Sequence, residues 1–166
     1  GLKAELDAIS GLTTMEKLDC SNNSIPSLYP ILGFSKLTDL DCSNTRVVLF
    51  SNKYDNTKQM SSLTNFKCTG SWLTTVYIYS DVIETIDVSD NQITELKLFS
   101  GMSTLKELYV QNNQLEEIAV SDFTSLKKLD CSNNFLQELA VPKSTTLYKL
   151  KCYGNEITAL DVKGTD

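Results

Sequence analysis

The chain has 166 residues, a length that suits a single domain. Its 15 basic and 21 acidic residues give a net charge of −6, which argues against nucleic acid or an anionic membrane as the main partner. The sequence contains no histidine, which removes the commonest general base and metal ligand and any Ser-His or Cys-His nucleophile pair.

A motif with the pattern L-x-x-L-x-C-x-x-N-x-L recurs along the chain. The sextet LDCSNN occupies residues 18–23 and returns at 129–134, and LDCSNT lies at 40–45. Before them, residues 1–14 match the back half of such a unit, because SGLTTM at 10–15 matches SGMSTL at 100–105 and Leu6 falls where Leu96 does. Complete units follow, beginning at residues 15, 37, 63, 83, 105, 126 and 147. A fixed period of this length predicts a solenoid, here one domain over residues 1–166.

Each unit predicts the same local structure. The alternating apolar residues of L-x-L-x-C point inward from a half-buried strand, and neighbouring copies stack as parallel strands roughly 4.8 Å apart. Where the chain leaves that strand, a side chain able to bond the backbone of its own and adjacent coils predicts a ladder. The ladder positions are Asn23, Thr45, Ser71, Asn91, Asn113, Asn134 and Asn155.

Further apolar positions predict the rest of each coil. A second period-two pair follows the ladder residue and predicts a short strand on the opposite side, at 76–78, 96–98, 118–120, 139–141 and 160–162. A third apolar position precedes the next unit and is expected to plug a corner of the core, at Leu12, Phe34, Met60, Met102 and Phe123. Residues 48–60 depart from the pattern and predict an irregular excursion.

The motif resembles the leucine-rich repeats, and cysteine at its third apolar position is similar to the cysteine-containing, internalin-like repeats of bacterial cell-surface proteins. LKKLDCSNNFLQELAVPKSTT and LYKLKCYGNEITALDVKGTD carry the resemblance best. It implies an α/β-class leucine-rich repeat solenoid, here mostly β, wound as a right-handed superhelix with a parallel concave sheet and short second strands opposite. It also implies surface display and protein binding.

Five cysteines are an odd number and show no C-x-x-C cluster, which argues against a zinc site. Val88 and Val110 fill the same position in two repeats, which favours buried, reduced thiols that act as small hydrophobes. Asp19 and Asp41 are weak candidates for a cation site, because two carboxylates lack the further oxygen ligands that calcium needs. We therefore expect neither a metal nor a cofactor.

The concave sheet is the first candidate binding surface, because solenoids commonly bind through it. Its outward columns are expected to include the small polar residues Ser21, Ser43, Ser89 and Ser132. Residues 126–153 carry a net charge of +3 and residues 81–122 one of −7, so an acidic partner suits the C-terminal end. We call that candidate site the basic–aromatic end; it consists of Tyr109, Lys127, Lys128, Tyr148, Lys149, Lys151 and Tyr153.

The opposite face offers an alternative, since exposed aromatic side chains in one cluster suggest an interface. The excursion at 48–60 is an equally good explanation, if it folds back over them. This rear aromatic patch consists of Tyr29, Trp72, Tyr77, Tyr79 and Phe99.

The function expected first is a non-catalytic module that binds a protein, or a glycan, on its concave sheet, as a monomer or as a weak dimer joined through strand edges. The alternative is a structural spacer within a larger surface adhesin. An enzyme is disfavoured, because the sequence has neither a glycine-rich phosphate loop nor a nucleophile elbow. No apolar run is long enough to cross a bilayer, and the first residues lack the order of a signal peptide. Because the chain starts at Gly1, we expect a signal or anchor outside this segment and an extracellular or cell-surface location.

Overall fold

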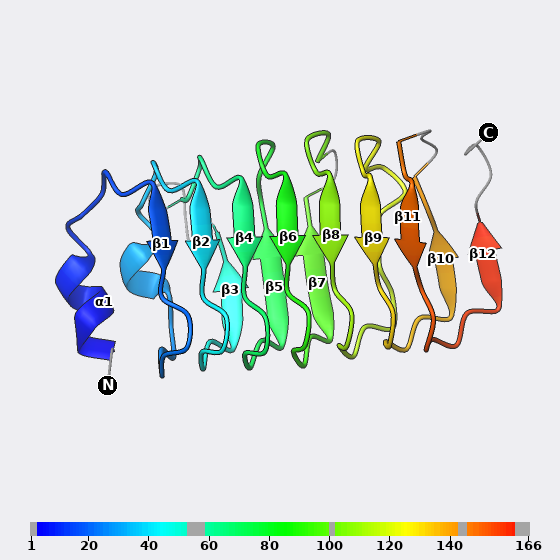
Figure 1. The fold of residues 1–166 in the computed structure, drawn as a ribbon, viewed down its shortest axis with the longest axis horizontal. Helices are drawn as coiled ribbons and strands as arrows, with labels where there is room; N and C mark the ends of the chain where they lie inside the picture. The colour runs from blue at the N-terminus through cyan, green and yellow to red at the C-terminus, as the bar shows by residue number, and fades with distance from the viewer. Residues whose placement is uncertain (1–2, 53–58, 100–101, 143–145, 162–166) are drawn as a thin grey trace.

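The computed structural model describes residues 3–52, 59–99, 102–142 and 146–161, and in it the chain winds as a parallel solenoid (Figure 1). One strand from each of seven successive coils enters a single parallel sheet in the order β1-β2-β4-β6-β8-β9-β11. The predicted solenoid with a parallel main sheet is therefore confirmed. The strands of this sheet are β1 (Lys17–Asp19), β2 (Asp39–Asp41), β4 (Asn65–Lys67), β6 (Thr85–Asp87), β8 (Glu107–Tyr109), β9 (Lys128–Asp130) and β11 (Lys149–Lys151).

The register of this sheet joins equivalent repeat positions without a slip. The middle residue of each strand faces the interior, so that Leu40 pairs with Phe66 and Leu108 with Leu129. The middle residues of the five inner strands are buried, whereas Leu18 and Leu150 in the two edge strands are half-buried. The alternation read from the sequence thus builds one continuous core that no single coil closes alone.

A second row of strands lies on the opposite side, in two separate sheets. They are β3 (Leu49–Ser51), β5 (Thr75–Ile78) and β7 (Glu95–Leu98), then β10 (Glu138–Ala140) and β12 (Ala159–Asp161). A strand was expected at 118–120, but these residues form none, although Val120 is buried. The excursion expected at 48–60 is wrong at its start, because β3 pairs with β5 there, and the Phe50 ring stacks 3.9 Å from that of Phe66. Residues 53–58 lie outside the described part.

The N-terminal end differs from the expected half-repeat. Helix α1 (Lys3–Ile9) places Leu6 in the core, where a second strand was predicted, and packs against the 3₁₀ helix η1 (Tyr29–Ile31). Leu12 is 51% exposed, so the prediction that it plugs a corner is wrong, whereas Phe34, Met60, Met102 and Phe123 are buried as expected. Leu12 stays exposed because, within the described residues, no other coil packs over it.

The cysteine column lies inside the solenoid, as predicted. Cys20, Cys42, Cys68 and Cys131 are buried free thiols, and Cys152 is half-buried in the last coil. Burial raises the pKa of Cys20 and of Cys131 to about 12, so both thiols stay protonated near neutral pH. Val88 and Val110 occupy the same column with no exposed surface, which agrees with a packing role for the thiols.

The predicted ladder is present at the turn after each main strand. Asn113 shows the full pattern: its amide donates to the carbonyl oxygens of Val88 and Val110, both at 3.0 Å, and its Oδ1 accepts from the backbone N–H of Ile93 at 3.0 Å. Thr45 and Ser71 substitute with hydroxyl contacts to the Cys42 carbonyl, at 2.8 and 3.2 Å. One side chain therefore joins two coils.

A second, exposed row of asparagine, aspartate and glycine residues precedes the ladder and was not predicted. Its members have a left-handed backbone, which asparagine, aspartate and glycine tolerate best. Their side chains contact one another across coils, as when Asn112 donates to Asp90 and Asn133 donates to Asn112, each at 2.7 Å. The row consists of Asn22, Asn44, Gly70, Asp90, Asn112, Asn133 and Gly154.

Candidate functional site

The outward face of the main sheet is lined with cross-strand ion pairs. Lys67 lies 3.0 Å from Asp41, Lys128 lies 2.8 Å from Glu107 and Lys151 lies 3.1 Å from Asp130. Each pair joins neighbouring strands, so many of the lysines on this face are neutralised by a carboxylate on the adjacent strand. Lys17 and Asp39 form a similar but longer and more exposed pair, at 3.5 Å.

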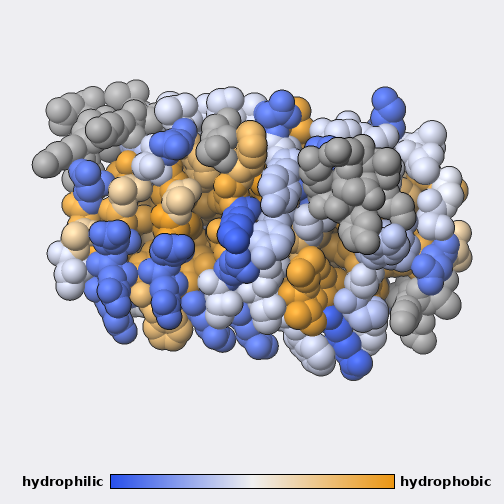
Figure 2. Space-filling model, turned by 180° about the vertical axis from the view of Figure 1, so that it is seen from behind, coloured by the Kyte–Doolittle hydropathy of each residue, from blue (hydrophilic) through white to orange (hydrophobic). Residues whose placement is uncertain are grey.

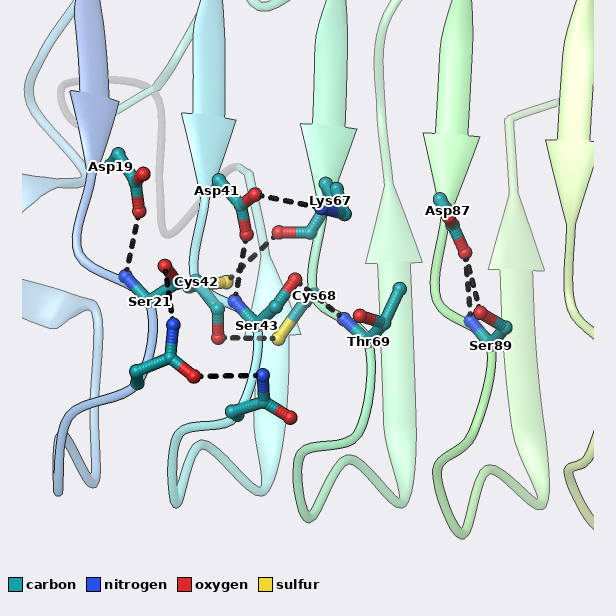
Figure 3. A network of polar contacts seen from close by, with 12 residues as sticks. Asp19, Ser21, Asp41, Cys42, Ser43, Lys67, Cys68, Thr69, Asp87 and Ser89 are labelled. Atoms are coloured by element: carbon teal, nitrogen blue, oxygen red, sulfur yellow. Dashed lines mark hydrogen bonds and ion pairs between the residues drawn. The ribbon is translucent and has the colours of Figure 1, made fainter.

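Short turns after the strands orient the carboxylates. The Ser43 N–H donates to Asp41 at 2.9 Å (Figure 3). The Ser132 hydroxyl donates to Asp130 at 2.6 Å. Burial by itself raises the pKa of Asp130, but the hydrogen bonds from Ser132 and Lys151 outweigh it and leave that pKa below its ordinary value. The serine column was expected to face solvent. That prediction is wrong for Ser43, Ser89 and Ser132, which are buried, whereas Ser21 is half-buried.

A hollow of about 420 Å³ lies on the N-terminal half of the concave sheet, and sequence reasoning missed it. Asp19, Asp41, Lys67 and Asp87 stand around it in one outward column, which shows in Figure 3 as side chains on four neighbouring strands. The available signal was the row of charged residues at equivalent repeat positions, three aspartates and one lysine. Within the described residues, no group of three or more carboxylate or thiol side chains is placed to hold a metal ion.

The structure brings the basic–aromatic end together across strands β8, β9 and β11. Tyr148 and Tyr153 are 70% and 62% exposed, and the N–H groups of Tyr148 and Lys149 both donate to the carbonyl of Lys127. Tyr109 is less available, because its hydroxyl donates to Glu107 at 2.9 Å. Since Lys128 and Lys151 are paired with acids, Lys127 and Lys149 carry the positive charge that is left for a partner.

The residues of the rear aromatic patch come from several elements, and Trp72 lines a hollow that none of the others lines. The Tyr77 hydroxyl donates to Glu95 at 2.8 Å, with Lys97 5.4 Å from the ring centroid, and Phe99 pairs by its backbone N–H with Ile78. Tyr79 and Phe99 are exposed on the second row of strands, and Tyr29 belongs to η1. Trp72 lies at a turn and lines a separate hollow with Asn22 and Asn44.

Apolar surface on the rear face gathers mainly in the C-terminal half, between hydrophilic side chains (Figure 2). A hollow of about 470 Å³ there is lined by Leu96, Ile118 and Leu139 together with Glu117 and Glu138. No motif in the sequence indicates this hollow. Among the described residues, no helix is long and apolar enough to cross a membrane.

Comparisons with known proteins agree on the type of fold. Residues 81–123 match the family model described as leucine rich repeats (2 copies). A stretch of 42 residues, 25% of the chain, is 43% identical to the leucine-rich repeat-containing G-protein coupled receptor 4 of Xenopus tropicalis, of which it covers 4%.

Similar solved structures include two bacterial proteins. YopM from Yersinia enterocolitica matches with a TM-score of 0.74 and 24% identity, over 92% of this chain and 32% of YopM. The internalin InlF from Listeria monocytogenes matches with a TM-score of 0.58 and 19% identity, over 93% of this chain and 56% of that one. The chain thus spans less than two thirds of either protein. It has the fold of a leucine-rich repeat solenoid, with YopM and an internalin among its structural neighbours.

Proposed function

We propose that this chain is a non-catalytic protein-binding module that is secreted or displayed on a bacterial surface. The leucine-rich repeat fold commonly serves to bind proteins and is typically non-catalytic, which supports the first part. The internalin-like cysteine repeats, of which LDCSNN is the clearest copy, support the second. Fractionation of the encoding organism tests the location: recovery of the protein only in the cytosol contradicts it.

The basic–aromatic end is the proposed contact surface. One observation carries the proposal: Tyr148 and Tyr153, the two most exposed large side chains of the main sheet's C-terminal end, flank Lys149 and Lys151 on β11. Tyrosine supplies contact area with few rotamers to order, and tyrosine is enriched in protein interfaces. Lys127 and Lys149 add positive charge that no carboxylate neutralises through an ion pair within the described residues.

This arrangement suits an acidic segment of a partner protein. Opposite charges at the rim of an interface accelerate association and orient the partner, and their effect weakens with salt. Lys127 and Lys149 are better positions for charge reversal than Lys128 and Lys151. Reversing Lys128 or Lys151 also breaks an ion pair with Glu107 or Asp130, whereas Lys127 and Lys149 have no such partner among the described ion pairs.

Phage-displayed dodecapeptides selected on the immobilised chain test the proposal. We expect enrichment of sequences rich in Asp and Glu, and at least a tenfold rise in Kd for the selected peptide with Lys127→Glu/Lys149→Glu or Tyr148→Ala. Lys17→Glu is the control, because it reverses the charge at the same repeat position at the other end of the sheet; it also breaks the exposed Lys17–Asp39 pair, so it would reveal any effect of a general disturbance of the sheet. If the selected peptides bind the Lys127→Glu/Lys149→Glu variant with unchanged Kd but lose affinity for the Lys17→Glu variant, the proposed site is wrong. Failure to select any acidic peptide favours the spacer function instead.

A further inference from the structure

The chain's single arginine and single tryptophan occupy the same repeat position in neighbouring coils. Arg46 follows ladder residue Thr45, and Trp72 follows ladder residue Ser71. The Arg46 guanidinium carbon lies 5.5 Å from the centroid of the Trp72 ring, within the range of a cation–π contact. Both side chains are exposed, with 52% of the Trp72 surface open to solvent. Within the described residues, Arg46 forms no ion pair with a carboxylate.

These two side chains border a shallow hollow of about 370 Å³ at the turns of the first three coils, which we call the rim hollow. Its walls are polar and hold no acidic residue, and Trp72 is its only aromatic side chain. The lining consists of Asn22, Asn23, Ser24, Asn44, Thr45, Arg46, Gly70 and Trp72.

Gly70 interrupts the exposed row of amides at this place. Asn44 donates from Nδ2 to Asn22 Oδ1 at 3.0 Å, which continues the row toward the N-terminus. Toward the C-terminus the row stops, because Gly70 has no side chain to continue it. A Cβ added at Gly70 would lie 2.6 Å from Asn44 Oδ1. No donor to Asn44 Oδ1 is present among the described contacts, whereas Asn112 Oδ1 accepts from Asn133 at 2.7 Å. The rim hollow therefore offers an acceptor, a cation and an aromatic face together.

We propose that the rim hollow binds an acidic saccharide, a pyranose unit that carries a carboxylate. The C–H face of a pyranose packs against an indole ring, and Trp72 offers such a face. Arg46 has five N–H donors in a planar fork that matches a carboxylate. Asn44 Oδ1 accepts from a sugar hydroxyl, and the amide of Asn22 lies next to it.

The lining favours a sugar over a peptide. An apolar side chain of a peptide would find only Trp72 to bury it in the rim hollow, whereas a sugar ring needs one aromatic face with polar groups around it. The absence of acidic residues from the lining leaves Arg46 available to an anion. This site lies at the turns rather than on the concave sheet, so its test does not depend on the proposed protein-binding surface.

The single tryptophan makes the test direct, because intrinsic tryptophan fluorescence reports on Trp72 alone. The chain is titrated with a uronic-acid-containing hexasaccharide panel, comprising hyaluronan, chondroitin and oligogalacturonate fragments, and with neutral chitohexaose. We expect a saturable fluorescence change with at least one uronate, and a weaker one with the neutral sugar. Arg46→Gln should raise the Kd for the uronate at least tenfold and narrow the difference between acidic and neutral sugars.

Two further variants complete the test, with binding measured by calorimetry. Trp72→Ala should abolish binding, whereas Phe135→Ala is the matched control: Phe135 holds the same repeat position with 50% exposure, but no arginine precedes it in the adjacent coil. In Gly70→Asn the new side chain suits the left-handed backbone but displaces the exposed amide of Asn44, so this variant should also remove binding while the circular dichroism spectrum is unchanged. The proposal is overturned if no uronate binds at millimolar concentration, if Trp72→Ala binds as well as the parent, or if chitohexaose binds as tightly as the uronates.

Discussion

Two consecutive residues at each turn hold the coils together in different ways. The second of them, such as Asn113, is buried and bonds the backbones of two coils. The first, such as Asn112, is exposed and has φ of 57°, a conformation that costs most side chains energy but suits asparagine. The NN pairs in the sequence therefore combine a structural ladder residue with a turn residue.

Asn113→Ala should destabilise the protein by about 3 kcal/mol, because two carbonyl oxygens and one N–H in the interior lose their partner. Asn112→Gly is the matched control. It keeps the left-handed turn and removes only exposed amide contacts, so we expect a loss below about 1 kcal/mol. Urea unfolding followed by circular dichroism measures both, and equal losses in the two variants would show that the ladder does not have the role assigned to it.

At the scale of elements, the interruption of the second row of strands has an electrostatic explanation. Glu95, Glu117 and Glu138 hold equivalent repeat positions in three successive coils. Like charges directly opposite each other weaken strand pairing, and Glu117 would face one on either side. Strand pairs form where this repulsion is absent, as between Thr75 and Glu95 or between Glu138 and Ala159.

Glu117→Thr should extend the second row of strands across the gap, because threonine stands at the equivalent position in β5 and favours strands. We expect slower amide hydrogen exchange in residues 117–120 of this variant than in the parent chain, where that segment pairs with no neighbouring strand. Glu116→Thr removes the same charge one residue earlier and serves as the control. If the two variants slow exchange equally, or neither does, repulsion at position 117 is not the cause of the interruption.

The sequence predicts the elements that depend on periodicity and misses those that depend on neighbours. The main strands and the cysteine column follow from the spacing of residues such as Leu40 and Cys42. The missing strand at 118–120 depends on charges in the two adjacent coils, and helix α1 depends on how the first coil is covered. The column of buried serines was misjudged because Ser132 turns back to bond Asp130, which no period-two pattern indicates.

At the scale of the whole molecule, the solenoid offers surfaces of different character. The concave sheet is mostly self-neutralised, since lysines such as Lys67 and Lys151 pair with aspartates on adjacent strands. Its C-terminal end is the exception, because Tyr148, Lys149 and Tyr153 stay exposed there. The composition of residues 126–153 indicated this end, but only the structure separates the paired lysines from the unpaired ones. The rear aromatic patch, by contrast, could not be judged from the sequence, because Trp72 and Tyr77 contact different neighbours.

The most direct test of the central claim, that the C-terminal end of the concave sheet is the binding surface, is an NMR titration. The ¹⁵N-labelled chain is titrated with the acidic peptide selected on it, and amide shifts are mapped onto the solenoid. We expect the largest amide shift changes on residues 127–128 and 148–153, and we expect these changes to become smaller as the salt concentration rises. Shifts centred on Tyr77, Tyr79 and Phe99, or on the Lys17 end of the sheet, would contradict the claim.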